Sequence, residues 1–480
     1  MALAMGFLLA GICDVSAWAQ NTQGPESSGV EALKERVKAL EQTVEDLKKE
    51  RGSAPGEAGN APPAGDRQQP TAGTSTTVPD HNRERAFLRQ DSYADPRLDN
   101  APFDPKLRGF FLIPGTQSML RIGGFARTDV IHDFEPAGNT SKFIPSSIPT
   151  GPNPGNDNTS MSVAPSRLSI ELRNNTRYGP LRIYYENDFN NGPNATNAFR
   201  LRHFYGQWAN VMVGQTWSLW KDSDAIPDTV DFAGPNSAIF IFQPQIRYTY
   251  GINEKNIVAM SVEQPSSAIP GTITTPTGTS NATATSPVPD FVTRYRYQRD
   301  GFHIQTAWLF RSVGGFVGAT REQQVFGWGG MLSAGARVYG KDNIVFQVAG
   351  GEGIARYILG LGSGSGLDAG LTSAGRLVAL PAYGAYVAYQ HFWTERWRST
   401  GTYGFLQANT TDLAQSSSNP APLFKQTQYA EGNVMYSPGH GFTIGAALLW
   451  GQYIEKDGAL GDAFRLNFVL QYDLVNLGNY

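Results

Sequence analysis

The residues with the clearest chemical potential in this chain are arginines that stand at alternate positions of strand-like runs. A guanidinium stays charged at any working pH, and its planar fork suits carboxylates. Alternate residues of a strand point to one face, so Arg200 and Arg202 share a face, as do Arg294 and Arg296. The pattern predicts a wall of fixed positive charge. Its members are Arg121, Arg127, Arg167, Arg173, Arg182, Arg200, Arg202, Arg247, Arg294 and Arg296.

Carboxylates accompany these arginines in two places. Glu186 and Asp188 alternate along the same run as Arg182. A later stretch, here called the acidic loop, carries Asp222, Asp224, Asp228 and Asp231.

The last strand-like run shows best what kind of element holds these side chains. Between Phe464 and Tyr472 every second residue is apolar or aromatic, and the residues between them are polar except Val469. A period of two places the two sets on opposite faces of a sheet. About 10 residues is the length that crosses a bilayer as a tilted strand. Similar alternation recurs from about Met119 onward.

The alternation, short turns and long polar loops predict an all-β chain that forms a transmembrane antiparallel β-barrel. We expect about 16 strands, with the barrel over residues 109–480. Aromatic residues on the apolar faces would form girdles at the lipid interfaces. These residues are Tyr248, Tyr250, Tyr295, Tyr297, Trp308, Tyr389 and Trp450.

In such a barrel the arginines and the acidic loop would line a water-filled lumen and its constriction. Opposed rows of charge create a field across the lumen, and the excess of arginine predicts a preference for anions. Two alternatives stay open. Each arginine could pair with a neighbouring carboxylate, such as Glu171, and only solvate the wall. Trp217 and Trp220 could either pack the loop or contact a solute.

Composition excludes several classes of protein. The formal net charge is −3, so no nucleic-acid partner is expected. No apolar run of membrane-helix length occurs beyond the start of the chain. The 6 histidines are scattered without metal spacing or a nucleophile elbow, so we expect no enzyme, no catalytic residue, no metal and no cofactor. Alternatives to an open channel are a plugged barrel and a trimeric barrel with a tethering or adhesive role.

The N-terminal region has three expected parts. Residues 1–19, which contain the single cysteine Cys13, resemble a secretory signal peptide. Residues 20–51 carry apolar residues at heptad spacing from Val30 to Leu47 and predict a coiled-coil helix. Residues 52–108 form a disordered Pro/Gly-rich linker and a polar strap. The strap could stay in the periplasm or enter the lumen.

Several strings resemble the DcaP-like trimeric porins of Gram-negative bacteria. The segment from Gly109 to Phe125 resembles their opening strand, Phe199–Trp208 a following block, and Asp222–Pro235 their acidic third loop. The last resemblance implies that the acidic loop folds into the barrel and places its aspartates opposite the arginines. Later matches are Arg294–Arg296 and Gly350–Tyr357. The resemblance implies a 16-stranded barrel in outer-membrane lipid, a homotrimer, and diffusion of small anionic, dicarboxylate-like solutes. It also implies that the coiled coil lies in the periplasm and joins the three protomers.

Overall fold

The computed structural model divides the chain into two compact units, residues 1–75 and 76–480, and the second contains the fold. In the first unit only Lys38 and Gln42, both helical, are described, so the signal peptide, the heptads and the linker lie outside the described residues. The remaining described segments are 91–98, 109–151, 155, 157–191, 197–269, 272–275, 278–317, 321–362, 366–372, 376–410 and 423–474.

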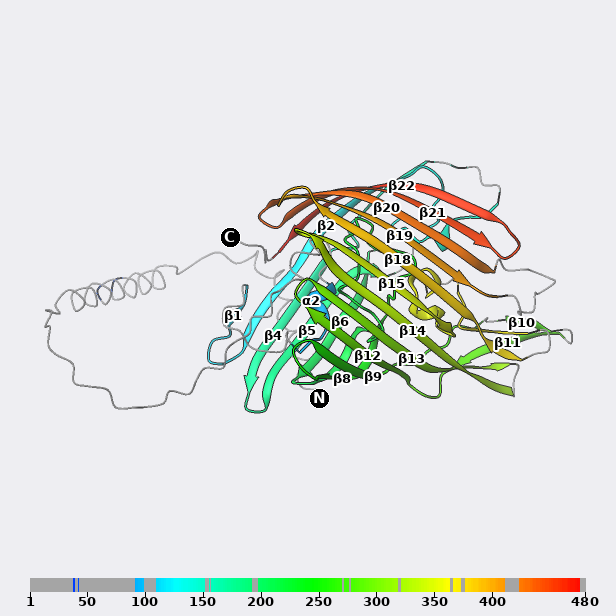
Figure 1. Ribbon diagram of the computed structural model, residues 1–480, viewed down its shortest axis with the longest axis horizontal. Helices are drawn as coiled ribbons and strands as arrows, with labels where there is room; N and C mark the ends of the chain where they lie inside the picture. Colours follow the sequence, from blue (N-terminus) through cyan, green and yellow to red (C-terminus); the bar gives the residue numbers. More distant parts are fainter. Residues whose placement is uncertain are drawn as a thin grey trace, which may run out of the picture. The chain divides into compact units, whose positions relative to one another are not determined.

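Sixteen antiparallel strands of the second unit close into a barrel, which confirms the predicted fold class (Figure 1). Each strand pairs with the next along the chain, and the last, β22, pairs with the first, β2. Closure leaves no free sheet edge, as a bilayer requires. The barrel strands are β2 (Met119–Asp133), β4 (Arg167–Thr176), β5 (Gly179–Asn191), β6 (Ala198–Trp208), β7 (Val211–Trp217), β8 (Phe242–Gly251), β9 (Asn256–Glu263), β12 (Asp290–Arg299), β13 (Phe302–Val317), β14 (Arg321–Tyr339), β15 (Asp342–Glu352), β18 (Pro381–Phe392), β19 (Trp397–Ala408), β20 (Phe424–Gly439), β21 (Phe442–Glu455) and β22 (Leu460–Asp473).

Short elements extend the barrel or lie in its loops. The strands β1 (Phe111–Leu112) and β3 (Asn158–Ser162) pair with β2. The strands β10 (Thr272–Thr275) and β11 (Gly278–Thr285) form a hairpin, and β11 also pairs with β13. The strands β16 (Ala369–Leu371) and β17 (Leu377–Ala379) pair with each other. Among the described residues, no helix has the length and apolar character needed to cross a membrane. The remaining short elements are α2 (Asp91–Ala94), α3 (Leu359–Gly362), η1 (Pro145–Ser147) and η2 (Ala355–Tyr357).

The two faces of the barrel wall differ as the sequence predicts. Along β22, exposed and buried residues alternate without interruption until the last position. Leu466 on the outer face is 43% exposed, whereas its neighbour Arg465 on the inner face is 1% exposed. The outer face is therefore apolar and the lumen face polar. The girdle aromatics follow this division: Tyr248, Tyr250, Tyr295, Trp308 and Tyr389 are exposed, whereas Tyr297 and Trp450 are half-buried.

The strands are joined by short turns at one end of the barrel and by long loops at the other. Short connections include Ala209-Asn210 between β6 and β7 and Asp300-Gly301 between β12 and β13. The longer connection between β7 and β8, residues 218–241, is here named L3. Its side chains are almost all buried inside the barrel, so L3 folds into the lumen instead of standing in solvent. This inward path positions the candidate site.

Candidate functional site

L3 is anchored to the lumen wall along its whole length. The Trp220 indole donates to the backbone oxygen of Ala307 on β13 (3.2 Å). Further along, the Ser237 hydroxyl donates to the backbone oxygen of Ala385 on β18 (2.8 Å). The Asn236 amide donates to the hydroxyl of Thr427 on β20 (2.8 Å). L3 therefore crosses the lumen and narrows it from the side of β13 to β20.

The two tryptophans beside L3 pack the protein interior. Trp217 and Trp220 are both 0% exposed. The Trp217 ring stacks on Phe242 with ring centroids 3.6 Å apart, and the Trp220 ring meets Tyr357 edge to face at 5.5 Å. Neither ring is accessible to a solute, so both fix the start of L3.

Near the short-turn end of the barrel, one carboxylate forms ion pairs with three of the arginines that the sequence analysis selected. Glu171 on β4 lies 2.8 Å from Arg121, 2.7 Å from Arg173 and 2.8 Å from Arg182. All four side chains are at most 5% exposed. The local charge of these four ionised groups is positive, and the guanidinium stack follows the neighbouring strands β2, β4 and β5.

A second charged cluster lies farther along the same wall, toward the long-loop end. Arg202 on β6 bridges Glu186 (2.7 Å) and Asp188 (2.9 Å). Arg200 lies 2.6 Å from Asp188, and Arg167 lies 3.4 Å from Glu186. The arginines again outnumber the carboxylates. The arginines of the first strands thus lie in two clusters, and each one named here has an acidic neighbour.

Arg127 links this wall to L3. Its guanidinium pairs with Asp129 on the same strand (2.6 Å) and also donates to the backbone oxygen of Val230 in L3 (2.5 Å). The contact with L3 is thus made to a peptide oxygen and not to one of the acidic side chains of the loop.

The first two L3 carboxylates bond to β12, β13 and β14. Arg296 reaches Asp222 (3.3 Å) and Asp224 (2.6 Å). The hydroxyl of Ser333 donates to Asp222 (2.6 Å), and His303 Nε2 lies 3.0 Å from the same carboxylate oxygen. Burial opposes ionisation of Asp222, but His303 and Arg296 hold its pKa below the usual range. Serine and histidine both face the carboxylate instead of each other, so this trio lacks the nucleophile–base contact that hydrolysis needs.

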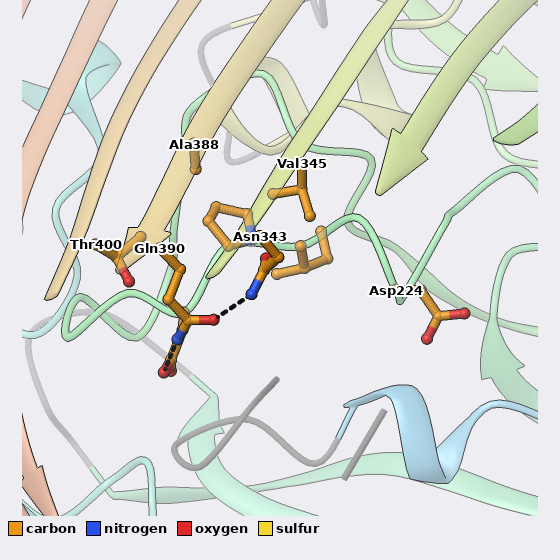
Figure 2. Close-up of a pocket in the computed structure, with 9 residues that line it drawn as sticks. Asp224, Asn343, Val345, Ala388, Gln390 and Thr400 are labelled. Atoms are coloured by element: carbon orange, nitrogen blue, oxygen red, sulfur yellow. Dashed lines mark hydrogen bonds between the residues drawn. The ribbon is translucent and has the colours of Figure 1, made fainter. Parts of the chain in front are cut away.

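The other two L3 carboxylates also have partners inside the barrel. Asp228 lies 2.7 Å from Arg398 on β19 and accepts from Gln390 on β18 at 3.0 Å. Figure 2 shows the hydrogen bond between Asn343 and Gln390, which line a cavity of about 10 Å³. Asp231 accepts from the backbone N–H groups of Phe143 (3.3 Å) and Gly234 (2.9 Å). The acidic residues thus hold L3 in place.

A larger cavity of about 320 Å³ lies on the long-loop side of L3. Three basic side chains come to it from different elements, namely Lys142 from the loop after β2, Arg200 from β6 and Arg356 from η2. No carboxylate is among its lining residues. The rest of the lining is apolar or glycine: Ile144, Phe232, Ala233, Phe240, Ile241, Leu359 and Gly362.

Two of these three cations, Lys142 and Arg356, were missed by the sequence reasoning because they lie in loops, outside any alternating run. Arg356 is held by Gln243 (2.9 Å) and Asp290 (3.3 Å). The Lys142 ammonium donates to the backbone oxygen of Asn190 (3.3 Å). The pKa of Lys142 is lowered to about 8. Burial is the main cause and the nearby charge of Arg200 acts in the same direction, whereas the carboxylates of Asp188 and Asp231 act in the opposite direction. The only available signal was the string Gly350–Tyr357, which contains Arg356.

Arg247 and Arg294 complete the set. Arg247 on β8 binds Asp95 of the N-terminal segment (3.0 Å), whereas Nε of Arg294 on β12 has no hydrogen-bond partner among the described residues. Within the described part of the chain, no group of three or more histidine, cysteine or acidic side chains could hold a metal ion. The arrangement is one of fixed charges around a narrowed lumen.

Comparison with known proteins agrees with this geometry. The family model described as "DcaP outer membrane protein" matches residues 112–474. The chain belongs to the DcaP outer membrane protein family. Family members are outer-membrane channels of the porin type, so the chain is an outer-membrane β-barrel channel protein. Among curated proteins, none matches the sequence significantly.

The chain resembles several solved outer-membrane proteins at low sequence identity. The outer membrane channel DcaP of Acinetobacter baumannii is 18% identical, with a TM-score of 0.65 over 76% of this chain and 99% of that one. An anion-selective porin from Comamonas acidovorans is 9% identical, with a TM-score of 0.48 over 74% and 100%. OmpT of Vibrio cholerae is 9% identical, with a TM-score of 0.47 over 76% and 100%.

Proposed function

We propose that the protein is a passive channel for small anionic solutes, of the size and charge of dicarboxylates. The observation that carries the proposal is the lining of the 320 Å³ cavity, which has three cations and no carboxylate. A cavity of this volume suits a small molecule. Fixed positive charge in a narrow, low-dielectric passage attracts anions and repels cations.

The lining also suggests what kind of anion passes. Arg200 and Arg356 come from different elements, β6 and η2, and apolar side chains such as Phe232 and Leu359 also line the cavity. A solute with two carboxylates on a short carbon body could meet both guanidinium groups while its body contacts the apolar lining. We propose that the remaining charged residues selected from the sequence line the rest of the solute pathway. The arginines among them outnumber their acidic partners.

We further propose a homotrimer with the short-turn end and the N-terminal segment in the periplasm. Short periplasmic turns and long extracellular loops are the usual polarity of outer-membrane barrels. The heptad spacing of residues 30–47 supports a coiled coil that would join the protomers there. The large apolar side chains exposed on the outer face of the described strands, such as Leu448, Leu466 and Phe468, support contact with lipid.

The test is the reversal potential of the purified protein in a planar bilayer under a KCl gradient. We expect anion preference, and we expect R200Q and R356Q each to reduce it. K255Q, an exposed lysine in the turn between β8 and β9, removes the same charge far from the cavity and is the matched control. Cation preference in the native protein, or equal effects of R356Q and K255Q, would refute the proposal.

A plugged barrel is the second candidate, because residues 91–98 lie against the lumen wall. It predicts that the folded protein shows no conductance under any salt condition. Measurable current in the same bilayer experiment decides against it.

A further inference from the structure

The short segment 91–98, here named the lumen strap, lies inside the barrel against the wall formed by β4 to β8. The Tyr205 hydroxyl donates to the backbone oxygen of Ala94 (2.9 Å), and Arg182 donates to that of Tyr93 (3.0 Å). The Tyr93 hydroxyl donates to Glu171, and its ring lies 4.1 Å from the Arg121 guanidinium. Figure 1 draws α2, the first turn of the strap, beside β5 and β6.

The strap places a carboxylate of the chain itself in a cluster of lumen arginines. Asp95 is 4% exposed and lies 3.0 Å from the Arg247 guanidinium. It also acts electrostatically on Arg294, which is 7% exposed and whose Nε has no hydrogen-bond partner among the described residues. Asp95 therefore pairs with one buried guanidinium group and lies within the electrostatic reach of a second, whose Nε has no hydrogen-bond partner among the described residues.

The strap is also tied to L3. Arg97 lies 2.7 Å from Asp224, and Asp224 lies 2.6 Å from Arg296 on the opposite side. The Gln207 amide donates to the backbone oxygen of Arg97 (2.7 Å). Asp224 thus links the strap to the loop that narrows the lumen, so a displaced strap would also loosen the first part of L3.

We infer that the lumen strap occupies a second anion site of the channel, made by Arg247 and Arg294, and keeps it closed to solutes until the strap leaves. The inference rests on the proposed function, because it concerns regulation of the same pathway. Asp95 stands where the carboxylate of a solute would bind. A solute carboxylate competes with Asp95 for Arg247, and removal of the strap widens the short-turn half of the lumen and exposes its arginines.

The contacts that hold the strap are ones that water or a solute can replace. Among the described residues, its regular structure is the single turn Asp91–Ala94, and hydrogen bonds to the wall together with the ion pairs of Asp95 and Arg97 attach it. When the strap leaves, water or a solute anion takes its place on the wall, so the net free-energy cost is well below the gross strength of these contacts. The apolar attachment is small, since only Ala94 and Tyr93 pack against the cluster formed by Tyr184, Tyr205 and Met212.

The first experiment compares D95N/R97Q with the native protein in single-channel recordings. Loss of both ion pairs should release the strap, raise the conductance and shift the reversal potential further toward the anion value. D457N, which alters an exposed carboxylate in the loop between β21 and β22, is the control and should match the native protein. Unchanged conductance and unchanged selectivity in D95N/R97Q would overturn the inference.

A second variant fixes the strap in place without removing its charges. A Cβ on Gly251 would lie 3.4 Å from Cδ1 of Leu98, so in L98C/G251C, in a C13S background, a short reducible thiol cross-linker can join the two cysteines. The cross-linked, oxidised protein should show only the low-conductance state, and a reductant should restore the higher one. Identical currents before and after reduction of the cross-link would overturn the inference.

The two variants separate this inference from the proposed function. Succinate added to the bath should block the reduced protein more strongly than the oxidised protein, because only the reduced protein can offer Arg247. If the native channel prefers cations but the L98C/G251C cross-link still changes its conductance, the proposed anion selectivity is wrong and the strap inference holds. If the channel prefers anions but the cross-link has no effect, only the strap inference is wrong.

Discussion

Nε of Arg398 on β19 lies 2.7 Å from a carboxylate oxygen of Asp228 in L3, and both side chains are almost completely buried. This ion pair joins the middle of the inward loop to the barrel wall at β19. Loss of one partner leaves an uncompensated charge in a low-dielectric site. The pair is therefore one of the contacts that hold L3 across the lumen.

We expect R398M to destabilise the folded barrel by about 3–5 kcal/mol and to increase current noise, because Asp228 would lose its cation. The double variant D228N/R398M should recover much of that stability, since no charge is left unpaired. Urea unfolding in lipid vesicles measures the first effect and bilayer recordings the second. R396M, which changes an exposed arginine two residues away, is the control. Equal stability of R398M and R396M would contradict the structural role of the pair.

Lys142 predicts a dependence of selectivity on pH. Burial lowers its pKa to about 8, Arg200 also lowers it, and Asp188 and Asp231 oppose the shift. The ammonium is charged below that pKa and neutral above it, so anion preference should fall as pH rises from about 7 to 9. Reversal potentials across this range measure the effect. K142R should remove the pH dependence, and K142Q should give the weaker selectivity at every pH.

The same shift has a consequence for stability, with a definite sign. The pKa of Lys142 is lower in the folded protein than its ordinary value of 10.5. Between pH 8 and 10.5 the unfolded chain therefore binds more protons than the folded protein, and stability contributed by this group rises with pH. A K142Q variant should lack this increment. A native protein whose unfolding midpoint is flat across that window would show that Lys142 is not shifted.

The sequence predicted the barrel because its strands carry a local signal. In β22 the period of two alone separates the lipid face from the lumen face, and Val469 is a single apolar residue on the polar side. The resemblance of Asp222–Pro235 to an acidic third loop also indicated an inward loop. What local pattern does not contain is which wall the loop carboxylates meet, since Asp228 and Arg398 are 170 residues apart in the chain.

The cavity and the strap were harder to predict for the same reason. Lys142 and Arg356 lie in irregular loops, where no periodicity assigns a face. Asp95 and Arg247 are separated by 152 residues, and nothing near Asp95 marks it as a lumen residue. The sequence left the strap free to enter the lumen or stay outside it. Only the closed barrel brings these residues together.

Gly124 in β2 provides a test of the backbone geometry. Its φ is +123°, and a Cβ placed there would lie 2.2 Å from the backbone oxygen of Arg167 on β4. The strained conformation alone costs on the order of 1–3 kcal/mol for a residue with a side chain, and the clash adds to it. We expect G124A to reduce the yield of heat-modifiable, folded barrel. G432A, where a Cβ would meet nothing within 4 Å, should fold normally.

The lipid face of β22 provides a test that the barrel spans a bilayer. Leu466 lies near the middle of the strand, opposite Leu448 on β21, and Leu460 is the first residue of the same strand. Both side chains are exposed to similar degrees, 43% and 48%. In a membrane, arginine at the midplane costs about 2–4 kcal/mol, whereas near the interface the cost is about 0–1 kcal/mol. Folding titrations of L466R and L460R in phosphatidylcholine vesicles should show this difference. In water, both exposed positions would tolerate arginine equally well. Equal costs for L466R and L460R would therefore contradict a position of Leu466 near the bilayer midplane.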